Sequence, residues 1–171
     1  ALSAKSKKKA LKGNRAADRA KPLTRPNGRL SLVMDSGCTY HCHPNRDDLI
    51  NFQYRRESIS GIDGVECAIT GYGDLPIVAK DSTGTRRKFI IKDVRHAPDF
   101  TDTLISVHQL FETSKARVRF EDVDAVLVSP AELTDPTITL PFVRRDGLYV
   151  WDVDHDGDSR SNPSGQALAA G

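Results

Sequence analysis

The sequence is poor in the residues that hold proteins together by special chemistry. Only three of its 171 residues are cysteine, and this odd number excludes a fully paired disulfide framework. No apolar run approaches the ~18 residues of a membrane-spanning helix, and no apolar stretch follows the charged N-terminus as in a signal peptide. Aromatic residues make up 6% of the chain and are scattered, which argues against a base-stacking surface. We therefore expect a protein of a reducing, intracellular compartment, without membrane association.

Charge is spread unevenly along the chain. Residues 1–29 carry ten Lys and Arg against one acid, a net charge of +9, whereas residues 30–171 carry fifteen bases and twenty-two acids, a net of −7. The basic segment has few apolar residues, so we predict a disordered linker over residues 1–29. Weak contact with RNA phosphates and a merely solvated linker both remain open for it. Residues 154–171, rich in Ser, Gly, Asp and Ala, are predicted to be a second linker.

Between these tails, residues 30–153 have the pattern of an all-β domain. The predicted strands are Leu30–Asp35, Glu66–Thr70, Leu75–Ala79, Arg87–Val94, Ala116–Glu121, Ala125–Val128, Ile138–Val143 and Leu148–Val153. A turn at Gly71-Tyr72-Gly73-Asp74 is expected to join the second and third of them into a hairpin. One helix is predicted over Leu104–Thr113, with Leu104, Val107, His108 and Phe111 on one stripe. Many short strands with one helix indicate a small β barrel or a sandwich-like domain.

The triplet Asp35-Ser36-Gly37 at the end of an apolar strand is the strongest candidate for chemistry. Aspartic proteases present a catalytic carboxylate in this way, and two such carboxylates share one proton because both cannot easily ionise at close range. The chain has a single triplet of this kind, so the second aspartate would come from another copy. Taken alone, the same three residues also suit a surface turn.

Further blocks follow the triplet in a fixed order. They are Thr39-Tyr40-His41, Ile69-Thr70-Gly71-Tyr72-Gly73, Ile91-Lys92-Asp93-Val94-Arg95-His96-Ala97-Pro98, Thr103-Leu104-Ile105-Ser106-Val107-His108-Gln109-Leu110, Val118-Arg119-Phe120 and Gly147-Leu148-Tyr149. This ordered series resembles the protease region of copia-type LTR retrotransposon gag-pol polyproteins over residues 30–152.

The resemblance implies a small retropepsin-like closed β barrel that is active as a symmetric homodimer and cuts polyprotein peptides without a metal or cofactor. It implies a catalytic triplet of Asp35, Ser36 and Gly37, flap or substrate-binding residues Ile69, Gly71, Tyr72 and Gly73, and support beneath the active-site loop from Leu104, Ile105 and Ser106. Its expected location is the cytoplasm, within virus-like particles. The alternative is a catalytically idle, protease-like module for dimerisation or capsid assembly, with residues 1–29 tethering RNA.

Two other patterns imitate metal sites. Cys38, His41, Cys42 and His43 crowd into six residues, but no second ligand pair accompanies them beyond Cys67, so we predict no zinc site. The acidic run from Asp152 to Asp158 fits the first half of an EF-hand loop. Its twelfth position is Pro163 instead of Glu, which favours a solvated acidic segment.

Overall fold

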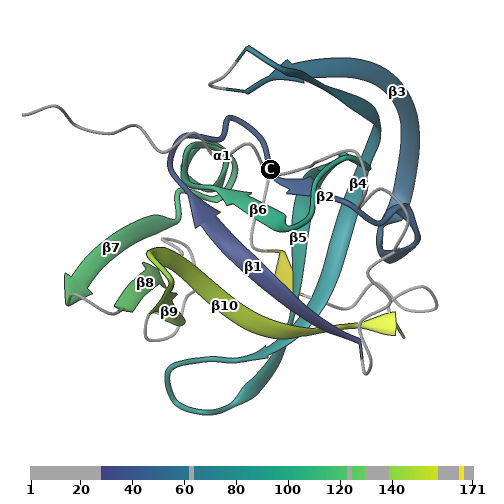
Figure 1. The fold of residues 1–171 in the computed structure, drawn as a ribbon. Coiled ribbons are helices and arrows are strands. Elements are labelled where there is room, and N and C mark those ends of the chain that lie inside the picture. The colour runs from purple at the N-terminus through teal and green to yellow at the C-terminus, as the bar shows by residue number, and fades with distance from the viewer. Residues whose placement is uncertain (1–27, 62–63, 123–124, 130–138, 158–165, 168–171) are drawn as a thin grey trace, which may run out of the picture.

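The computed structural model describes residues 28–61, 64–122, 125–129, 139–157 and 166–167, and the statements below concern these residues (Figure 1). Residues 1–27, which hold most of the predicted basic linker, lie outside them. In chain order the elements are β1 (Arg29–Asp35), β2 (Cys42–His43), the 3-10 helix η1 (Arg46–Asp48), β3 (Ile50–Ser60), β4 (Glu66–Lys80), β5 (Arg86–His96), β6 (Thr103–Ser106), α1 (Val107–Ser114), β7 (Arg117–Asp122), β8 (Ala125–Ser129), β9 (Leu140–Arg145), β10 (Leu148–His155) and β11 (Gln166–Ala167).

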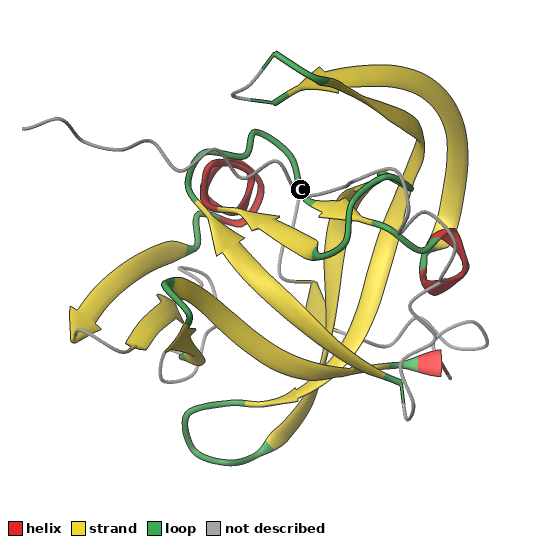
Figure 2. Cartoon of the chain, viewed as in Figure 1, coloured by secondary structure: helices red, strands yellow, loops and turns green. Residues whose placement is uncertain are grey.

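The fold is mostly β, with one short α-helix packed at one end of the sheet (Figure 2). The strands follow the order β3-β4-β5-β2-β6-β1-β10-β9-β8-β7, and β11 pairs in parallel with β5. At the centre, β1 is antiparallel to β10 and parallel to β6. This pairing confirms the all-β class and places the ends of β1 and β6 side by side.

The sheet curls on itself without forming the predicted closed barrel. β10 also pairs with β4, at Asp154 with Val78 and His155 with Ile77, which brings distant parts of the strand order together. β3 and the β7–β8 ribbon stay outside this curl, and each end strand pairs with a single neighbour among the described elements. The domain is therefore barrel-like, and the closed barrel was a wrong prediction.

The predicted turn at Gly71–Asp74 is also wrong, because residues 66–80 form one continuous strand, β4. The hairpin reverses earlier, between Ser60 and Glu66, where the backbone amide of Gly61 donates to the carbonyl of Val65 at 2.9 Å. A Cβ added at Gly71 would lie 2.3 Å from the carbonyl oxygen of Gln53, and one at Gly73 would lie 2.8 Å from that of Ile50. These glycines thus serve the close approach of β3 to β4.

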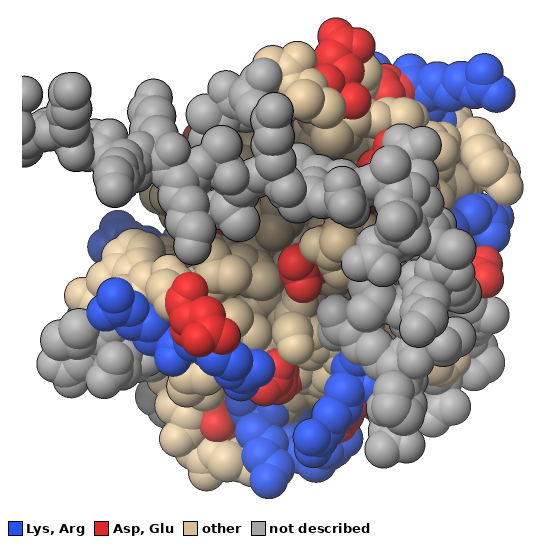
Figure 3. All heavy atoms as spheres, in the orientation of Figure 1, with Lys and Arg blue, Asp and Glu red and all other residues tan. Residues whose placement is uncertain are grey.

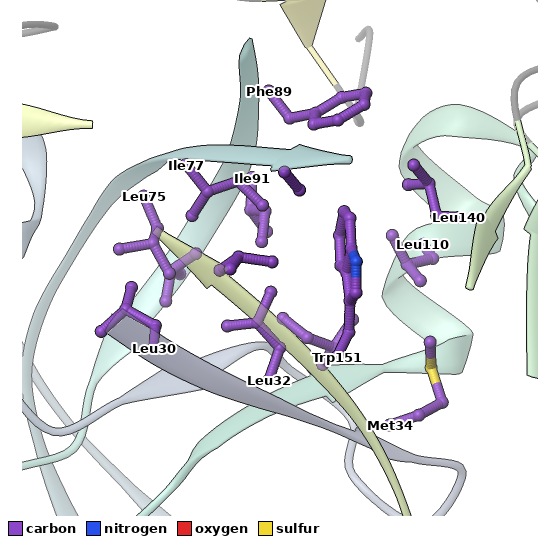
Figure 4. Close-up of a cluster of buried hydrophobic side chains, with 14 of the residues drawn as sticks. Leu30, Leu32, Met34, Leu75, Ile77, Phe89, Ile91, Leu110, Leu140 and Trp151 are labelled. Atoms are coloured by element: carbon purple, nitrogen blue, oxygen red, sulfur yellow. The ribbon is translucent and has the colours of Figure 1, made fainter. Parts of the chain in front are cut away.

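Trp151 lies in the middle of the main core, between Phe89 and Phe142, with ring centroids at 6.0 and 5.4 Å (Figure 4). Around it pack side chains from β1, β4, β5, β6, α1 and β9, including Leu32, Leu75, Ile77, Ile91, Leu110 and Leu140. Burial of such apolar area contributes ~25 cal/mol per Å². The core thus ties β1, which carries Asp35, to strands on every side.

The helix differs from the predicted one in bounds and in its buried face. Leu104 and Ile105 belong to β6, and α1 begins only at Val107, with Ser106 as its N-cap. Gln109 and Leu110 are the buried helical residues, whereas Phe111 of the predicted stripe is 47% exposed. No helix of the described residues is long and apolar enough to cross a membrane.

The acidic run near the C-terminus is paired with cations of neighbouring strands. β10 continues through Asp154 and His155, beyond the linker boundary predicted at residue 153. Asp152 contacts Arg145 at 2.7 Å, Asp154 contacts Arg86 at 3.1 Å, and Asp156 contacts Lys88 at 3.1 Å. Figure 3, in the orientation of Figure 1, shows acidic and basic side chains gathered together on the lower half of the visible face. The EF-hand-like pattern is thus explained by cross-strand ion pairs.

Candidate active site

Asp35 ends β1 at an accessible edge of the domain. β1 and β6 run in parallel with Asp35 opposite Ser106, so the chain leaves β1 beside the start of α1. The backbone N–H of Gly37 donates to Oδ1 of Asp35 at 2.7 Å, which fixes the carboxylate against its own turn. Ser36 and Gly37 are exposed and Asp35 is half-buried. The triplet thus presents the Asp35 carboxylate in a tight loop. Residues 35–41 are called the active-site loop below.

Ser106 anchors this loop from below. Its hydroxyl donates to the carbonyl of Cys38 at 2.6 Å and accepts from the backbone N–H of Gln109 at 3.0 Å, the latter being the N-cap bond of α1. Its own N–H donates to Nδ1 of His41 at 2.9 Å. Ser106 is fully buried, so one residue joins the loop, β6 and the helix in a site closed to water.

His41 forms the other half of this anchor. Its backbone N–H donates to Oε1 of Gln109 at 2.7 Å, while its ring accepts the Ser106 amide. Because Nδ1 is the acceptor, the ring proton sits on Nε2, which has no hydrogen-bond partner among the described residues. Burial lowers the pKa of His41 to about 3, so the imidazole is neutral at physiological pH.

Gln109 extends the anchor to β5. Its side-chain amide donates to the carbonyls of Asp93 at 3.1 Å and Lys92 at 3.3 Å. Sequence reasoning missed both His41 and Gln109 as support residues. The spacing Ser106-x-x-Gln109 is a capping-box pattern and could have indicated the helix start. In the usual capping box, the side chain of the third helical residue accepts from the backbone N–H of the N-cap residue. Here the Gln109 side chain accepts from the His41 N–H instead, and the Ser106 N–H donates to the His41 ring.

A second polar layer lies behind the loop. His43 contacts the hydroxyl of Thr103 through Nδ1 at 2.7 Å and Oδ2 of Asp48 through Nε2 at 2.9 Å. Burial opposes ionisation of Asp48, yet the hydrogen bond from His43 holds the pKa of that carboxyl below its usual range. His96 donates through Nε2 to the carbonyl of Pro44 at 3.2 Å. These contacts give His43 and His96 a structural role.

The cysteines gather near the active-site loop without forming a metal site. The thiols of Cys38 and Cys42 both lie against the carbonyl oxygen of Tyr40, at 2.8 and 3.5 Å. Cys67 lies on β4 opposite Ile59 of β3. Within the described part of the chain, no group of three or more His, Cys, Asp or Glu side chains is arranged to hold a metal ion.

The hairpin formed by β3 and residues 66–73 of β4 is called the hairpin arm below, and the predicted flap residues lie in its lower part. In Figure 1 the arm extends above the active-site loop. Ile59 from the arm and Cys38 from the loop pack against one small cluster of Cys42, Ile69 and Ala97. Of the predicted residues, Ile69, Gly71 and Gly73 are buried, and Tyr72 is half-buried. The structure therefore places them below the hairpin turn.

Arg95 links the arm to the loop. Its guanidinium lies 4.7 Å from the ring centroid of Tyr40 in the loop and 5.0 Å from that of Tyr72 on β4. Its Nε lies 3.5 Å from a carboxylate oxygen of Glu57 on β3. A cation held between two aromatic rings and beside a carboxylate connects four segments at the foot of the arm.

The three predicted support residues, Leu104, Ile105 and Ser106, form the end of β6 beside β1. Val33, Met34 and Asp35 of β1 stand opposite Leu104, Ile105 and Ser106 of β6. Ile105 is buried in the main core, and Leu104 packs against the cluster of Cys42, Ile69 and Ala97. The pair thus points to the two faces of the sheet, one on each side of the strand that carries the triplet.

Comparison with known proteins gives one finding. Residues 32–116 match the family model described as the Pol polyprotein beta-barrel domain. No curated protein and no solved structure matches the chain. The matched residues run from within β1 to just beyond α1 and include the triplet, the hairpin arm and the anchor. The match supports a Pol polyprotein region and a retrotransposon-related context for this part of the chain.

Proposed function

We propose that the chain is an aspartic endopeptidase of a copia-type retrotransposon, which processes the gag-pol polyprotein with one Asp35 from each of two identical chains. The observation that carries the proposal is the presentation of Asp35. Its carboxylate stands at the end of a core strand, held by the Gly37 amide at 2.7 Å, in a loop anchored from below by buried hydrogen bonds. A surface turn would need no such anchor.

The proposed chemistry uses the two carboxyl groups in different protonation states. One Asp35 carboxylate takes a proton from water as the water oxygen attacks the scissile carbonyl carbon. The protonated Asp35 of the other copy donates to the carbonyl oxygen, giving a tetrahedral diol. Protonation of the nitrogen then releases the two peptides. Ser36 and Gly37, exposed beside Asp35, would line the contact between the two loops.

Exposed apolar side chains near this end of the domain support the second copy as a partner. Tyr149 pairs with Met34, one residue before Asp35, and its neighbour Leu148 is 51% exposed. Phe120 is 56% exposed and contacts Tyr149 edge-to-face, with ring centroids 5.0 Å apart. Tyr40 in the active-site loop is 38% exposed. Several large apolar groups at one edge are typical of a surface that is covered in the working assembly.

The arm would act as a flap. It stands above the loop, and every described position of β3 is exposed or half-buried, so few core contacts oppose its movement over a bound peptide. Because the predicted turn at residues 71–74 is absent, the moving part of this flap is the hairpin end around Ser60 and Glu66. Ile69, Gly71, Tyr72 and Gly73 would form its foot.

The decisive experiment compares the full chain with Asp35→Asn on a polyprotein fragment. The amide keeps the shape and the hydrogen bond from Gly37 but cannot act as base, so cleavage should fall roughly 10⁴-fold while thermal unfolding is unchanged. Asp154→Asn is the matched control, because Asp154 lies at the opposite end of the β1–β10 pair and forms an exposed ion pair. Cleavage by Asp35→Asn at the normal rate contradicts the proposal.

A second measurement tests the dimer. Mixing wild-type chain with excess Asp35→Asn chain should suppress cleavage more steeply than simple dilution, because mixed dimers hold one carboxylate. Sedimentation at the assay concentration should show a dimer. A cleaving monomer would contradict the shared site, and a dimer that never cleaves would favour the idle assembly module. Contact of residues 1–29 with RNA and residence in virus-like particles remain predictions.

A further inference from the structure

Two cysteines lie next to the candidate catalytic triplet and have no part in the proposed hydrolysis. Cys38 follows Gly37 directly, and Cys42 begins β2. Both thiols approach the carbonyl oxygen of Tyr40, at 2.8 and 3.5 Å, so the two sulfur atoms can be no farther apart than the sum of these distances. Cys38 also packs against the cluster that contains Cys42. We propose that Cys38 and Cys42 form a reversible dithiol–disulfide site that responds to small-molecule disulfides.

The two thiols differ in the way that such a pair requires. Cys38 is half-buried in the active-site loop and reachable from solvent, whereas Cys42 is fully buried. The hydrogen bond from Cys42 lowers the pKa of Cys38 to about 7, with a further contribution from the Tyr40 backbone, although burial and Asp35 act against it. The same contact and burial raise the pKa of Cys42. Cys38 is therefore the attacking thiol and Cys42 the resolving one.

The reaction balances with a disulfide of the glutathione class as the oxidant. The Cys38 thiolate attacks one sulfur of the small disulfide, forms a mixed disulfide and expels one small thiolate. Loss of the Cys38 thiolate removes the main cause of the raised pKa of Cys42. Cys42 then gives up its proton, attacks the Cys38 sulfur and expels the second small thiol. The protein is oxidised by two electrons, and one small disulfide becomes two thiols.

Formation of the bridge acts on the loop that carries Asp35. In the reduced chain both thiols lie against the Tyr40 carbonyl, and the Cys38 carbonyl accepts from the Ser106 hydroxyl at 2.6 Å. A covalent bond between positions 38 and 42 removes both thiol donors and draws the chain after Gly37 toward β2. Displacement of a reacting group by about 1 Å can cost roughly 10²-fold in rate, so we expect cleavage to fall about tenfold or more. This regulatory effect rests on the proposed function; formation of the bridge does not.

The test uses the full chain incubated with glutathione disulfide. Intact mass should show the loss of two hydrogens, alkylation should then label a single cysteine, and peptide mapping should identify that cysteine as Cys67. Dithiothreitol should restore all three thiols and the original rate of cleavage. A bridge that contains Cys67, a covalent dimer through Cys38, or no bridge at all would overturn the proposal.

Variants separate the two roles without depending on activity. Cys42→Ala should stop at a stable glutathione adduct on Cys38, and Cys67→Ala should form the same bridge as the wild type. If Cys42→Ala fails to fold, Cys38→Ala in the accessible loop serves instead, and it should form no bridge and no glutathione adduct at Cys42. A bridge that forms without any change in cleavage overturns the regulatory part alone. Cleavage by Asp35→Asn at the normal rate would overturn the proposed protease mechanism. The mass measurement would still decide whether Cys38 and Cys42 form the proposed dithiol–disulfide site.

Discussion

The active-site loop and the hairpin arm lie on one side of the domain but are held by different means. The loop is fixed by buried side chains of three segments, with His41 and Ser106 fully buried and Gln109 7% exposed. The arm is held mainly by strand pairing: β3 pairs only with β4 among the described strands, and Tyr54 is 76% exposed. This difference in buried contacts is what the proposed function would require, because a site that positions a carboxylate and admits a peptide needs a firmly held loop and a weakly held cover.

The largest expected effect is a loss of stability caused by a substitution at the foot of the hairpin arm. In Gly71→Ala the new Cβ would lie 2.3 Å from the Gln53 carbonyl oxygen and 2.6 Å from the Phe52 ring, so β3 must move away from β4. We expect a loss of about 1–3 kcal/mol in the free energy of unfolding by urea. Gly157→Ala is the control, because nothing lies within 4 Å of a Cβ there. Equal stability of the two variants would mean that β3 and β4 are not so close in solution.

The loop should respond to pH more strongly than the arm. The pKa of His41 falls from 6.5 to about 3 on burial, so between these values the unfolded chain binds more protons than the folded one. The free energy of unfolding should therefore decrease as pH falls through this window, by up to about 1.4 kcal/mol per pH unit from this group. Burial lowers the pKa of His96 as well, which adds to the slope in the same direction.

His41→Asn isolates the contribution of the buried imidazole. The asparagine oxygen can still accept the Ser106 amide, but no group titrates, so the slope of unfolding free energy against pH should become shallower. Hydrogen exchange at decreasing pH should show β6 and α1 opening together with the loop. An unchanged slope in His41→Asn would show that the ring is not the group that titrates.

The elements that the sequence predicts best are those whose pattern reflects burial on one face. β1, β5 and β10 lie close to their predicted positions because their apolar residues enter the core. β3 was not predicted, because its residues are largely polar and exposed, so no alternation indicates a strand. Its existence depends on pairing with β4, which is a tertiary contact.

The hairpin turn was predicted at the wrong position because glycine serves two different purposes in this chain. Turns that need a left-handed backbone use Gly64, Gly84 and Gly147, all with positive φ. Gly71 and Gly73 do not have it; they are small so that the neighbouring strand can approach. In the site, the triplet could be found from local sequence alone. The anchor could not, because His41 and Ser106 lie 65 residues apart and meet only in the fold.

A moderate effect on the loop is expected from the loss of one hydroxyl. Ser106→Ala removes the N-cap of α1 and the donor to the Cys38 carbonyl, which should cost about 1–2 kcal/mol and loosen the turn that holds Asp35. Ser31→Ala removes an exposed hydroxyl that bonds Asp152 and should change stability by less than about 0.5 kcal/mol. Similar losses in both variants would contradict the special role of the buried anchor.

The smallest effect should come from the link between the two regions. Arg95→Lys keeps the charge near Glu57 but loses the planar guanidinium between Tyr40 and Tyr72, at a cost of about 0.5–1 kcal/mol. Amides of β3 and the outer part of β4 should then exchange with solvent faster, while those of β6 and α1 keep their rates. Arg86→Lys, in an exposed pair with Asp154, should leave both sets unchanged. Faster exchange in both regions would show that Arg95 supports the whole domain. Unchanged exchange would show that the arm is held without Arg95. Selective loosening of the arm is therefore the result that identifies Arg95 as the connection between the hairpin arm and the active-site loop.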